Sequence, residues 1–578
     1  SFLPPFRCLV ASTLFAFPWS FHKLSCRFAS SLSMELRSLT CLCAFALTFR
    51  LSLSQPSPAG GFAGDPKVRG VNLGGWLVVE GWIKPSLFAG IPNGDMLDGT
   101  QVQLMSLTMQ TFVSAQNGGG TAVTVDRATA SAWETFKLWR VSSSEFRLRT
   151  VGGQFLFCES GGCVVNTSDT GGIFVVERNV DNRIHLRLPS GSYLQAASGE
   201  KLTADYPGRP DWNANAATFQ MIIAANNLHG DYQLANGYGY ADAKEVLREH
   251  RSSFVTAEDF DFLARNGINT VRIPVGWWIA FDPEPPSPFV GGSLEALDSA
   301  FTWAQERGMK CIIDLHAAPN SQNGMEHSAS RDGTVGWPTS SDQIDLTLSV
   351  IDFLASRYTR HPALLGIELL NEPSASLVPL EVLLAYYKQG YQVVRKHSST
   401  AYVIVCQRIG SADPLELYQA DIGAHNLVVD LHFYNMFDEY FDNMNAASNT
   451  QYVYSNRRRQ LQSLLAANGP LVFIGKFSVL LLFRCRHLLR TAGEWVNEWN
   501  VSNASQEEYQ SFGSAQLDVY NAASFGWAYW TLKCDKKHWD FVWNVKYGYL
   551  QLGQQTGHSS MKKTPRVLWW LAAIPLFL

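Results

Sequence analysis

The chain has 578 residues, more than a compact domain of ordinary size, so we expect either two domains or one barrel with a large insertion. Hydrophobic residues make up 46% and charged residues 17% of the chain, the balance of a globular protein with an ample core. The net charge of -4 argues against a broad basic face, and we expect no nucleic-acid partner.

The N-terminal part of the chain predicts secretion. Residues 1–33 precede Met34 and have no periodicity, so we interpret them as non-native upstream sequence. Residues 34–55 combine a basic start, a short apolar run and a Pro-rich exit, which is typical of a signal peptide. The alternative is a membrane anchor over residues 1–55, although the apolar run is short for a membrane span.

Residues 66–99 are expected to hold a first barrel strand, Val68–Leu77, and its loop, and residues 100–222 differ in character. They have no helix-length periodicity but many short strand-like runs separated by Gly and Ser. Three loosely similar units, which start near Thr111, Gly153 and Ser192, recur at a period of roughly 40 residues. This repeat predicts an all-β β-trefoil inserted in the first strand-to-helix connection, at the catalytic face of the barrel.

Two kinds of covalent modification are predicted. Cys158 and Cys163 either close a small loop as a disulfide or remain as two buried free thiols. Glycosylation acceptor patterns begin at Asn166, Asn500 and Asn503, which fits a secreted protein.

Residues 223–555 alternate short apolar strands with amphipathic helices, and this alternation predicts a parallel sheet. The predicted strands are Asn269–Trp277, Lys310–Ala318, Ala363–Asn371, Ala401–Gln407, Leu427–Tyr434, Pro470–Gly475 and Gly526–Leu532. The predicted helices include Ser253–Asn266, Ser293–Arg307, Asp342–Tyr358, Leu380–Lys396 and Glu507–Ala522. With Val68–Leu77 the strands number eight, so the predicted fold class is α/β, a (β/α)₈ TIM barrel that contains the β-trefoil insertion.

The ends of these strands hold polar and aromatic side chains. Glu372 directly follows an apolar strand, where an ionised carboxylate is poorly explained by packing. Other such residues, in or at the ends of different strands, are Arg272, His316, His432, Tyr434 and Trp530. Because a barrel of this type gathers functional groups at the carboxyl ends of its strands, their joint placement predicts an active site.

Glycoside hydrolysis needs two carboxyl groups across the scissile bond, and Glu372 and Glu494 are the candidates. A pair separated by about 5 Å predicts retention through a glycosyl-enzyme. The ionised partner would keep Glu372 protonated by like-charge repulsion, and Arg272 would lie near Glu494 and keep it ionised. Glu498 is the alternative second carboxylate, but the Gly493-Glu-Trp495 motif favours Glu494.

Several motifs in order resemble a known family. Arg69–Glu80, Asn371-Glu-Pro373 and Gly526–Leu532 look like the exo-1,3-β-glucanase (glucan 1,3-β-glucosidase) branch of glycoside hydrolase family 5. More closely, the chain is similar to the plant members that have a fascin-like domain. The resemblance covers about residues 66–551, with one interruption.

The resemblance implies roles for individual residues. Glu372 would be the acid/base, Glu494 the nucleophile, and Asn371 the contact to the sugar 2-hydroxyl. The remaining residues would bind or position the terminal glucose: Glu80, Arg272, His316, His432, Tyr434 and Trp530. No metal or organic cofactor is implied, and we expect none. A β-glucan or β-glucoside is the expected substrate of a monomer that has no stable membrane partner and is located in the cell wall or apoplast.

The predicted trefoil would resemble a single fascin-like unit. In a secreted protein such a unit would bind carbohydrate or shape the substrate cleft, and a purely structural cap is the alternative. Actin binding would require that secretion fails.

The interruption lies at residues 476–493, between Gly475 and Glu494. This basic and apolar stretch contains no glycosidase motif, and its removal restores a continuous Gly-Glu-Trp, which suggests a retained intron or a gene-model error. An active exo-acting β-glucosidase or β-1,3-glucanase is the first hypothesis. The second is a catalytically impaired glycan-binding protein, since the insert would displace the nucleophile. Residues 556–578 are expected to be a disordered tail, with a lipid-anchor signal as the alternative.

Overall fold

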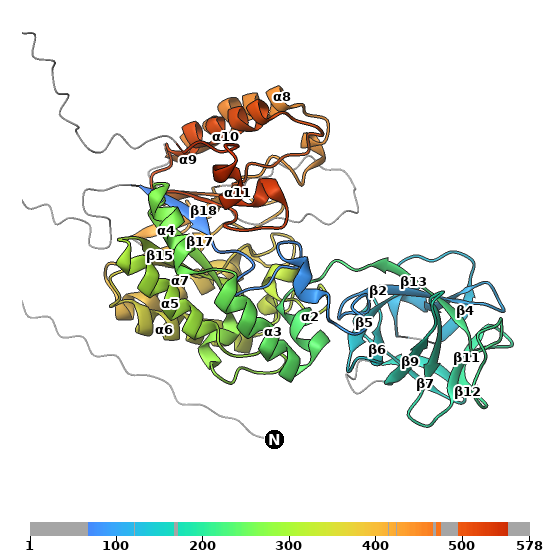
Figure 1. Cartoon of the computed structure of the whole chain (residues 1–578). Helices are drawn as coiled ribbons and strands as arrows, with labels where there is room; N and C mark the ends of the chain where they lie inside the picture. Colours follow the sequence, from blue (N-terminus) through green and yellow to red (C-terminus); the bar gives the residue numbers. More distant parts are fainter. Residues whose placement is uncertain are drawn as a thin grey trace, which may run out of the picture. The chain divides into compact units, whose positions relative to one another are not determined.

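A computed structural model describes residues 67–120, 122–166, 172–413, 415–423, 425–465, 470–475 and 495–552. The predicted upstream sequence, signal peptide, insert and C-terminal tail lie outside these residues, and so does Glu494. The described chain contains a closed parallel barrel and a 12-stranded antiparallel sheet (Figure 1).

The barrel closes from eight strands, as predicted. In order around the ring they are β1 (Val68–Asn72), β14 (Thr270–Gly276), β15 (Lys310–Ala317), β16 (Leu364–Glu368), β17 (Tyr402–Cys406), β18 (Leu427–His432), β19 (Leu471–Gly475) and β20 (Gly526–Tyr529). Every neighbouring pair is parallel, and β1 closes the ring on β20 with Val68 opposite Gly526. Each predicted strand corresponds to one of these, usually with a shorter ladder.

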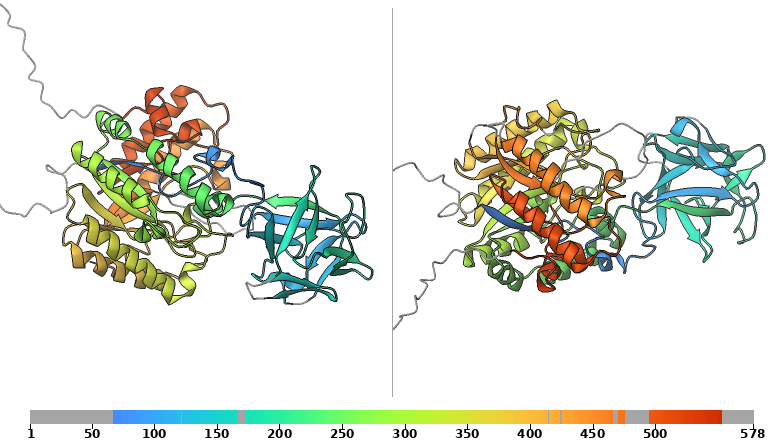
Figure 2. Two further views of the ribbon diagram at one scale, coloured as in Figure 1. Left: turned by 60° about the horizontal axis from the view of Figure 1, so that its bottom comes forward. Right: turned by 90° about the horizontal axis from the view of Figure 1, so that it is seen from above.

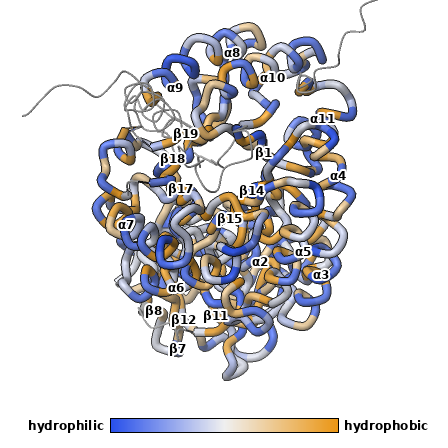
Figure 3. The backbone as a smooth tube through the Cα atoms, turned by 90° about the vertical axis from the view of Figure 1, so that its left-hand side faces the viewer, coloured by the Kyte–Doolittle hydropathy of each residue, from blue (hydrophilic) through white to orange (hydrophobic). Residues whose placement is uncertain are grey.

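Helices surround the strands. They are α2 (Asp231–Tyr238), α3 (Tyr240–Ser253), α4 (Ala257–Arg265), α5 (Ser293–Glu306), α6 (Ser341–Tyr358), α7 (Leu380–His397), α8 (Ala446–Tyr452), α9 (Arg458–Leu465), α10 (Gln506–Tyr520) and α11 (Phe541–Lys546). Figure 3 shows the barrel strands inside and helices such as α3, α6 and α7 around them. Strands in this position are buried on both faces, which explains their nearly continuous apolar sequences.

One predicted helix boundary was wrong. The helix expected to begin at Ser253 begins at Ala257, since Thr256 and Asp259 form a reciprocal capping box there. Ser253 instead ends α3, which the sequence analysis did not identify.

The 12-stranded sheet lies between β1 and α2 in the sequence. Its strands are β2 (Gln101–Ser106), β3 (Phe112–Ala115), β4 (Val123–Arg127), β5 (Thr135–Arg140), β6 (Glu145–Arg149), β7 (Phe155–Glu159), β8 (Gly162–Asn166), β9 (Phe174–Arg178), β10 (Arg183–Arg187), β11 (Tyr193–Ala197), β12 (Lys201–Tyr206) and β13 (Phe219–Ala225). We call residues 101–225 the β domain; Figure 2 shows it from two sides.

Pairing within the β domain repeats three times. Six strands pair in a closed ring, in the order β2, β5, β6, β9, β10 and β13, and β13 returns to β2. The other six form the hairpins β3–β4, β7–β8 and β11–β12. One core of buried side chains, which includes Phe136, Phe174 and Phe219, fills the domain. Cys158 and Cys163 form a disulfide across the β7–β8 hairpin.

Among the helices of the described residues, none is both long enough and apolar enough to cross a membrane.

Barrel closure depends on a glycine. Gly526 has φ +129°, and a Cβ there would lie 2.1 Å from the Val68 carbonyl oxygen of the adjacent strand. Gly308 also has positive φ, +65°, but a Cβ there would meet nothing within 4 Å. We predict that Gly308→Ala costs only the backbone strain, about 1–3 kcal/mol, whereas Gly526→Ala costs at least about 2 kcal/mol more. Urea unfolding of the two variants measures this difference, and equal losses would contradict it.

Candidate active site

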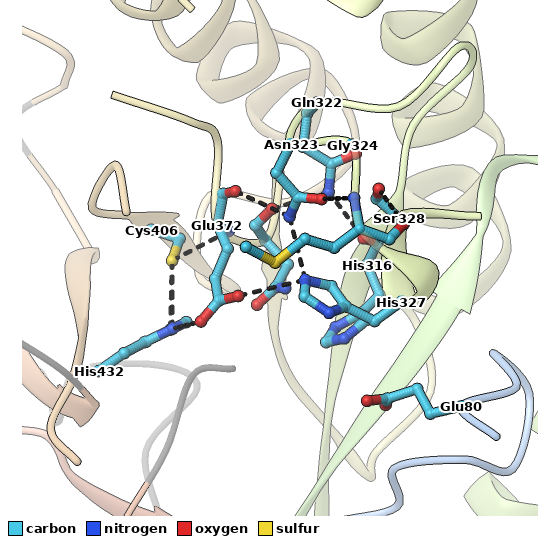
Figure 4. A network of polar contacts seen from close by, with 12 residues as sticks. Glu80, His316, Gln322, Asn323, Gly324, His327, Ser328, Glu372, Cys406 and His432 are labelled. Atoms are coloured by element: carbon cyan, nitrogen blue, oxygen red, sulfur yellow. Dashed lines mark hydrogen bonds and ion pairs between the residues drawn. The ribbon is translucent and has the colours of Figure 1, made fainter. Parts of the chain in front are cut away.

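Glu372 lies at the centre of a polar network at the carboxyl end of β16. The side chain is completely buried and the residue has φ +46°, a left-handed conformation that is unusual for a non-glycine residue. His432 Nδ1 lies 2.7 Å from one carboxylate oxygen, and His327 Nε2 lies 3.2 Å from the other (Figure 4). The carboxylate is therefore held between two imidazoles.

A second set of contacts fixes this glutamate from β17 and β18. The Glu372 backbone N–H donates to Cys406 Sγ at 3.3 Å, and the same sulfur lies 3.2 Å from His432 Nε2. That nitrogen also lies 3.2 Å from Asp430 Oδ2. Burial disfavours the charged imidazole, but Cys406 and Asp430 outweigh it and raise the pKa of His432 well above its ordinary value.

The pKa of Glu372 results from opposing effects. Burial raises the pKa, but the contacts with His327 and His432 lower it by more than burial raises it, and the resulting pKa is about 2. A carboxylate in this arrangement is ionised, whereas a general acid must hold a proton. The expected cause of a raised pKa is a second carboxylate at residue 494, which lies outside the described residues, so that expectation stays a prediction.

Arg272 is buried inside the barrel and is surrounded by polar side chains of neighbouring strands. Its guanidinium pairs with both oxygens of Glu368, at 2.7 and 2.9 Å, and lies 3.1 Å from Asp314. It also donates to Asn72 Oδ1 at 3.1 Å and to Asn371 Oδ1 at 2.9 Å. These contacts orient Asn371 directly. Proximity of Arg272 to residue 494 remains a prediction.

Four of the side chains in this region could offer metal ligands. Glu368, Cys406, Asp430 and His432 each place one such atom within 4.8 Å of the others. The Arg272 guanidinium already engages both oxygens of Glu368 and lies 3.7 Å from Asp430. A fixed cation thus neutralises these carboxylates. The expectation of a reaction without a metal stays a prediction.

The opposite side of the network comes from the first, third and eighth strands. Trp82 donates to Glu80 Oε2 at 3.0 Å, and burial raises the pKa of Glu80 to about 8. His316 Nδ1 lies 2.5 Å from Asp314, and its ring stacks on Trp530 with centroids 5.7 Å apart. Burial lowers the pKa of His316 to about 4.

Several polar atoms here are buried and lack a hydrogen-bond partner among the described residues. They include Glu80 Oε1, in the segment that follows β1, and His316 Nε2, Asn371 Nδ2 and Trp530 Nε1, at or just after the ends of β15, β16 and β20. Buried polar groups without a partner are rare in folded proteins. Four of them around one carboxylate suit a ligand rich in hydroxyl groups.

The remaining predicted residues are placed as follows. Tyr434 is buried after β18 and packs against Phe437 and Trp539, with centroids 5.6 and 5.7 Å away. Glu498 accepts hydrogen bonds from the Trp499 N–H and from the Tyr509 hydroxyl of α10. Its carboxylate is thus engaged with the helical layer.

Trp495, the residue after Glu494, lies in the line of the seventh strand. β19 pairs with β20 at Ile474 opposite Trp527, and Trp495 forms a parallel bridge to Tyr529 of that same strand. The Trp530 N–H donates to the Trp495 carbonyl at 2.9 Å. The chain therefore lies along β20 on both sides of residues 476–494.

Sequence reasoning missed His327, Asn323, Cys406 and Glu368. Glu368 had a detectable signal, because it is a charge inside an otherwise apolar strand. His327 and Asn323 lie in an irregular loop, where no periodicity marks them.

Comparisons with known proteins divide the chain in the same way. The family model described as Cellulase (glycosyl hydrolase family 5) matches residues 241–536, and Domain of unknown function (DUF7910) matches residues 93–224. The chain is 37% identical over 214 residues to "Glucan 1,3-beta-glucosidase" of Pichia angusta, which covers 36% of this chain and about half, 49%, of that relative.

Two other fungal relatives are covered more fully. "Probable glucan 1,3-beta-glucosidase A" of Aspergillus fumigatus is 32% identical over 53% of this chain and 76% of its own length. "Glucan 1,3-beta-glucosidase 1" of Schizosaccharomyces pombe is 30% identical over 58% of this chain and 84% of its own length. A solved structure, rutinosidase from Aspergillus niger, aligns with TM-score 0.46 at 19% identity, over 56% of this chain and 90% of that one.

The raised pKa of Glu80 makes a prediction about stability. Its folded-state pKa of about 8 exceeds the ordinary 4.5, so the proton it binds stabilises the fold fully below pH 4.5, and this contribution is lost as the pH rises through 8. The carboxamide of a glutamine at this position does not titrate in this pH range. The free energy of unfolding of the wild type, relative to Glu80→Gln, should therefore fall between these pH values, by about 1.4 kcal/mol per pKa unit at most. Urea titrations at pH 5, 6.5 and 8 test this, and parallel pH profiles would contradict it.

Proposed function

The chain belongs to glycosyl hydrolase family 5 and is a glycoside hydrolase that acts on β-glucosidic bonds, and we propose that it removes terminal glucose from 1,3-β-glucans or glucosides with net retention. The observation that supports this proposal is the placement of Glu372. It lies at the end of a barrel strand, between two imidazoles, among buried polar atoms that have no hydrogen-bond partner within the described part of the chain. We infer the 1,3-linkage and the exo action from the names of the fungal relatives, which are glucan 1,3-beta-glucosidases.

In the proposed reaction Glu372 first acts as an acid. It gives its proton to the glycosidic oxygen while the Glu494 carboxylate attacks the anomeric carbon, so that the C–O bond breaks and a glucosyl-enzyme ester forms. Glu372 then removes a proton from water, which attacks the same carbon and releases Glu494. The two inversions retain the β configuration.

The proposal for Glu494 is supported by its neighbour. Trp495 forms a parallel bridge to Tyr529 of β20, in line with β19. Glu494 directly precedes Trp495 in the sequence. Glu498, the alternative, is engaged by Tyr509.

The other predicted residues would bind the terminal sugar. Asn371, held by Arg272, would offer to the 2-hydroxyl its Nδ2–H, which has no partner among the residues that the structure describes, and neutral Glu80 would bond a further hydroxyl. Trp530, stacked on His316, would form the floor. His432 and Tyr434 would position Glu372 and the sugar. No cofactor is needed for this chemistry.

We propose that the β domain is a β-trefoil of fascin-like type, spanning about residues 100–222. A closed ring of six strands with three hairpins supports the trefoil. The family model that matches this region is described as a domain of unknown function, and the relatives named above are fungal, so they do not support the plant affiliation.

Secretion to the cell wall, a monomeric state and glycosylation also remain proposals. Asn500 and Asn503 are exposed, which would leave both open to a glycan. Asn166 lies in β8. The alternative function, glycan binding without turnover, has no support in the family match, and turnover by the unmodified chain would eliminate it.

The test is substitution of the acid/base. Glu372→Gln should lower kcat/KM for laminaribiose by about 10²–10⁴-fold, since a general acid is lost while the side chain keeps nearly the same size and shape. Azide added to Glu372→Ala should rescue turnover of an activated aryl β-glucoside and yield β-glucosyl azide. NMR of the first-formed glucose should show the β anomer. Full activity of Glu372→Gln would contradict the assignment, and an α anomer would contradict retention.

A further inference from the structure

The barrel loop at residues 318–340, between β15 and α6, holds the acid/base directly. Asn323 Nδ2 donates to the Glu372 carbonyl at 3.0 Å, and His327 contacts the carboxylate (Figure 4). Gln322 donates to the Asn371 carbonyl at 2.8 Å. This part of the loop thus fixes the backbone and the side chain of the glutamate from one side.

The other part of the same loop is bound to the β domain. The Arg331 guanidinium lies 3.5 Å over the ring of Trp139 in β5 and donates to the Arg140 carbonyl at 3.1 Å. Arg149 of β6 pairs with Asp332 and donates to Thr334 Oγ1 at 3.1 Å.

The ion pair between Arg149 and Asp332 is largely buried. The Asp332 side chain is only 3% exposed. Burial opposes its ionised form, but Lys137, Thr334 and Arg149 outweigh burial and lower the pKa of Asp332. Removal of Arg149 would take a directly paired cation from a buried carboxylate and leave Lys137 as the nearby positive charge, which is unfavourable and would hold the loop less firmly at Asp332.

The two parts of the loop contact each other, so a displacement of one part is expected to displace the other. Gly324, next to Asn323, approaches Gly333 so closely that a Cβ on Gly324 would lie 2.6 Å from the Gly333 carbonyl oxygen. In the same loop, Ser321 Oγ and Ser328 Oγ share a hydrogen bond of 2.6 Å. A displacement at Asp332 would therefore reach His327.

We propose that the β domain is a positioning element of the active site: through Arg149 and Trp139 it holds the 318–340 loop, which in turn aims the Glu372 carboxyl at the glycosidic oxygen. This rests on the proposed function. Its consequence is that a change on β6, in the domain of unknown function, impairs proton donation specifically.

The experiment compares leaving groups in the full chain. Laminaribiose needs a proton on its departing alkoxide, whereas 2,4-dinitrophenyl β-glucoside releases a stable phenolate without one, and kcat/KM reports this first step for both. Arg149→Ala should lower kcat/KM about 10-fold or more for laminaribiose but less than about 2-fold for the dinitrophenyl glucoside, because a shift of about 1 Å in a catalytic group costs on the order of 10²-fold. Arg149→Lys should recover part of the loss.

The matched control is Arg187→Ala, which breaks an Arg187–Glu177 pair of 3.3 Å within the same domain and should change neither substrate. Glu372→Ala sets the limit of leaving-group discrimination. Equal losses on both substrates, or none, would overturn the positioning role. If Arg149→Ala fails to fold, the Lys variant makes the same comparison. A wild type that hydrolyses neither substrate would instead contradict the proposed function.

Discussion

Arg272 places a permanent positive charge inside the barrel with only 1% of its surface exposed, and four consecutive strands meet on it. It lies in β14 and bonds Asn72 at the end of β1, Asp314 of β15 and Glu368 of β16. The free-energy cost of burying an unpaired guanidinium in this position would be prohibitive, so these strands must keep a common register. The same cation orients Asn371, the residue before Glu372. Barrel closure and active-site geometry therefore depend on one buried charge.

The protonation state of Glu372 depends on opposing effects of its neighbours. His327 and His432 favour its ionised form strongly enough to bring its pKa to about 2. An acid catalyst requires the opposite, and a nearby ionised carboxylate is the physical means of raising the pKa. The arrangement described here favours the ionised form of Glu372, whereas the proposed acid role requires a neighbouring ionised carboxylate. His327 belongs to the 318–340 loop, and another part of this loop contacts the β domain. Contacts from both folded parts of the chain therefore affect the protonation of Glu372.

Much of this could be predicted from the sequence. Apolar strands alternating with helices indicated the eight-stranded barrel, and the polar residues at strand ends, such as Glu372 and His432, do meet. The repeated texture of residues 100–222 indicated an all-β insertion. What could not be predicted depends on tertiary contacts. His327 becomes a partner of Glu372 only because the 318–340 loop folds back, and Arg149 meets Asp332 across 183 positions of sequence. No local pattern encodes either contact.

Active-site labelling shows which carboxylate is the nucleophile. A 2-deoxy-2-fluoro-β-glucoside with an activated leaving group slows the second step and traps the glucosyl-enzyme, and peptide mass spectrometry then locates the sugar. We expect one fluoroglucosyl group per active chain, attached to Glu494 in the peptide that contains Trp495. A label on Glu498 or on any other carboxylate, or turnover of the natural substrate with no labelled peptide, would contradict it.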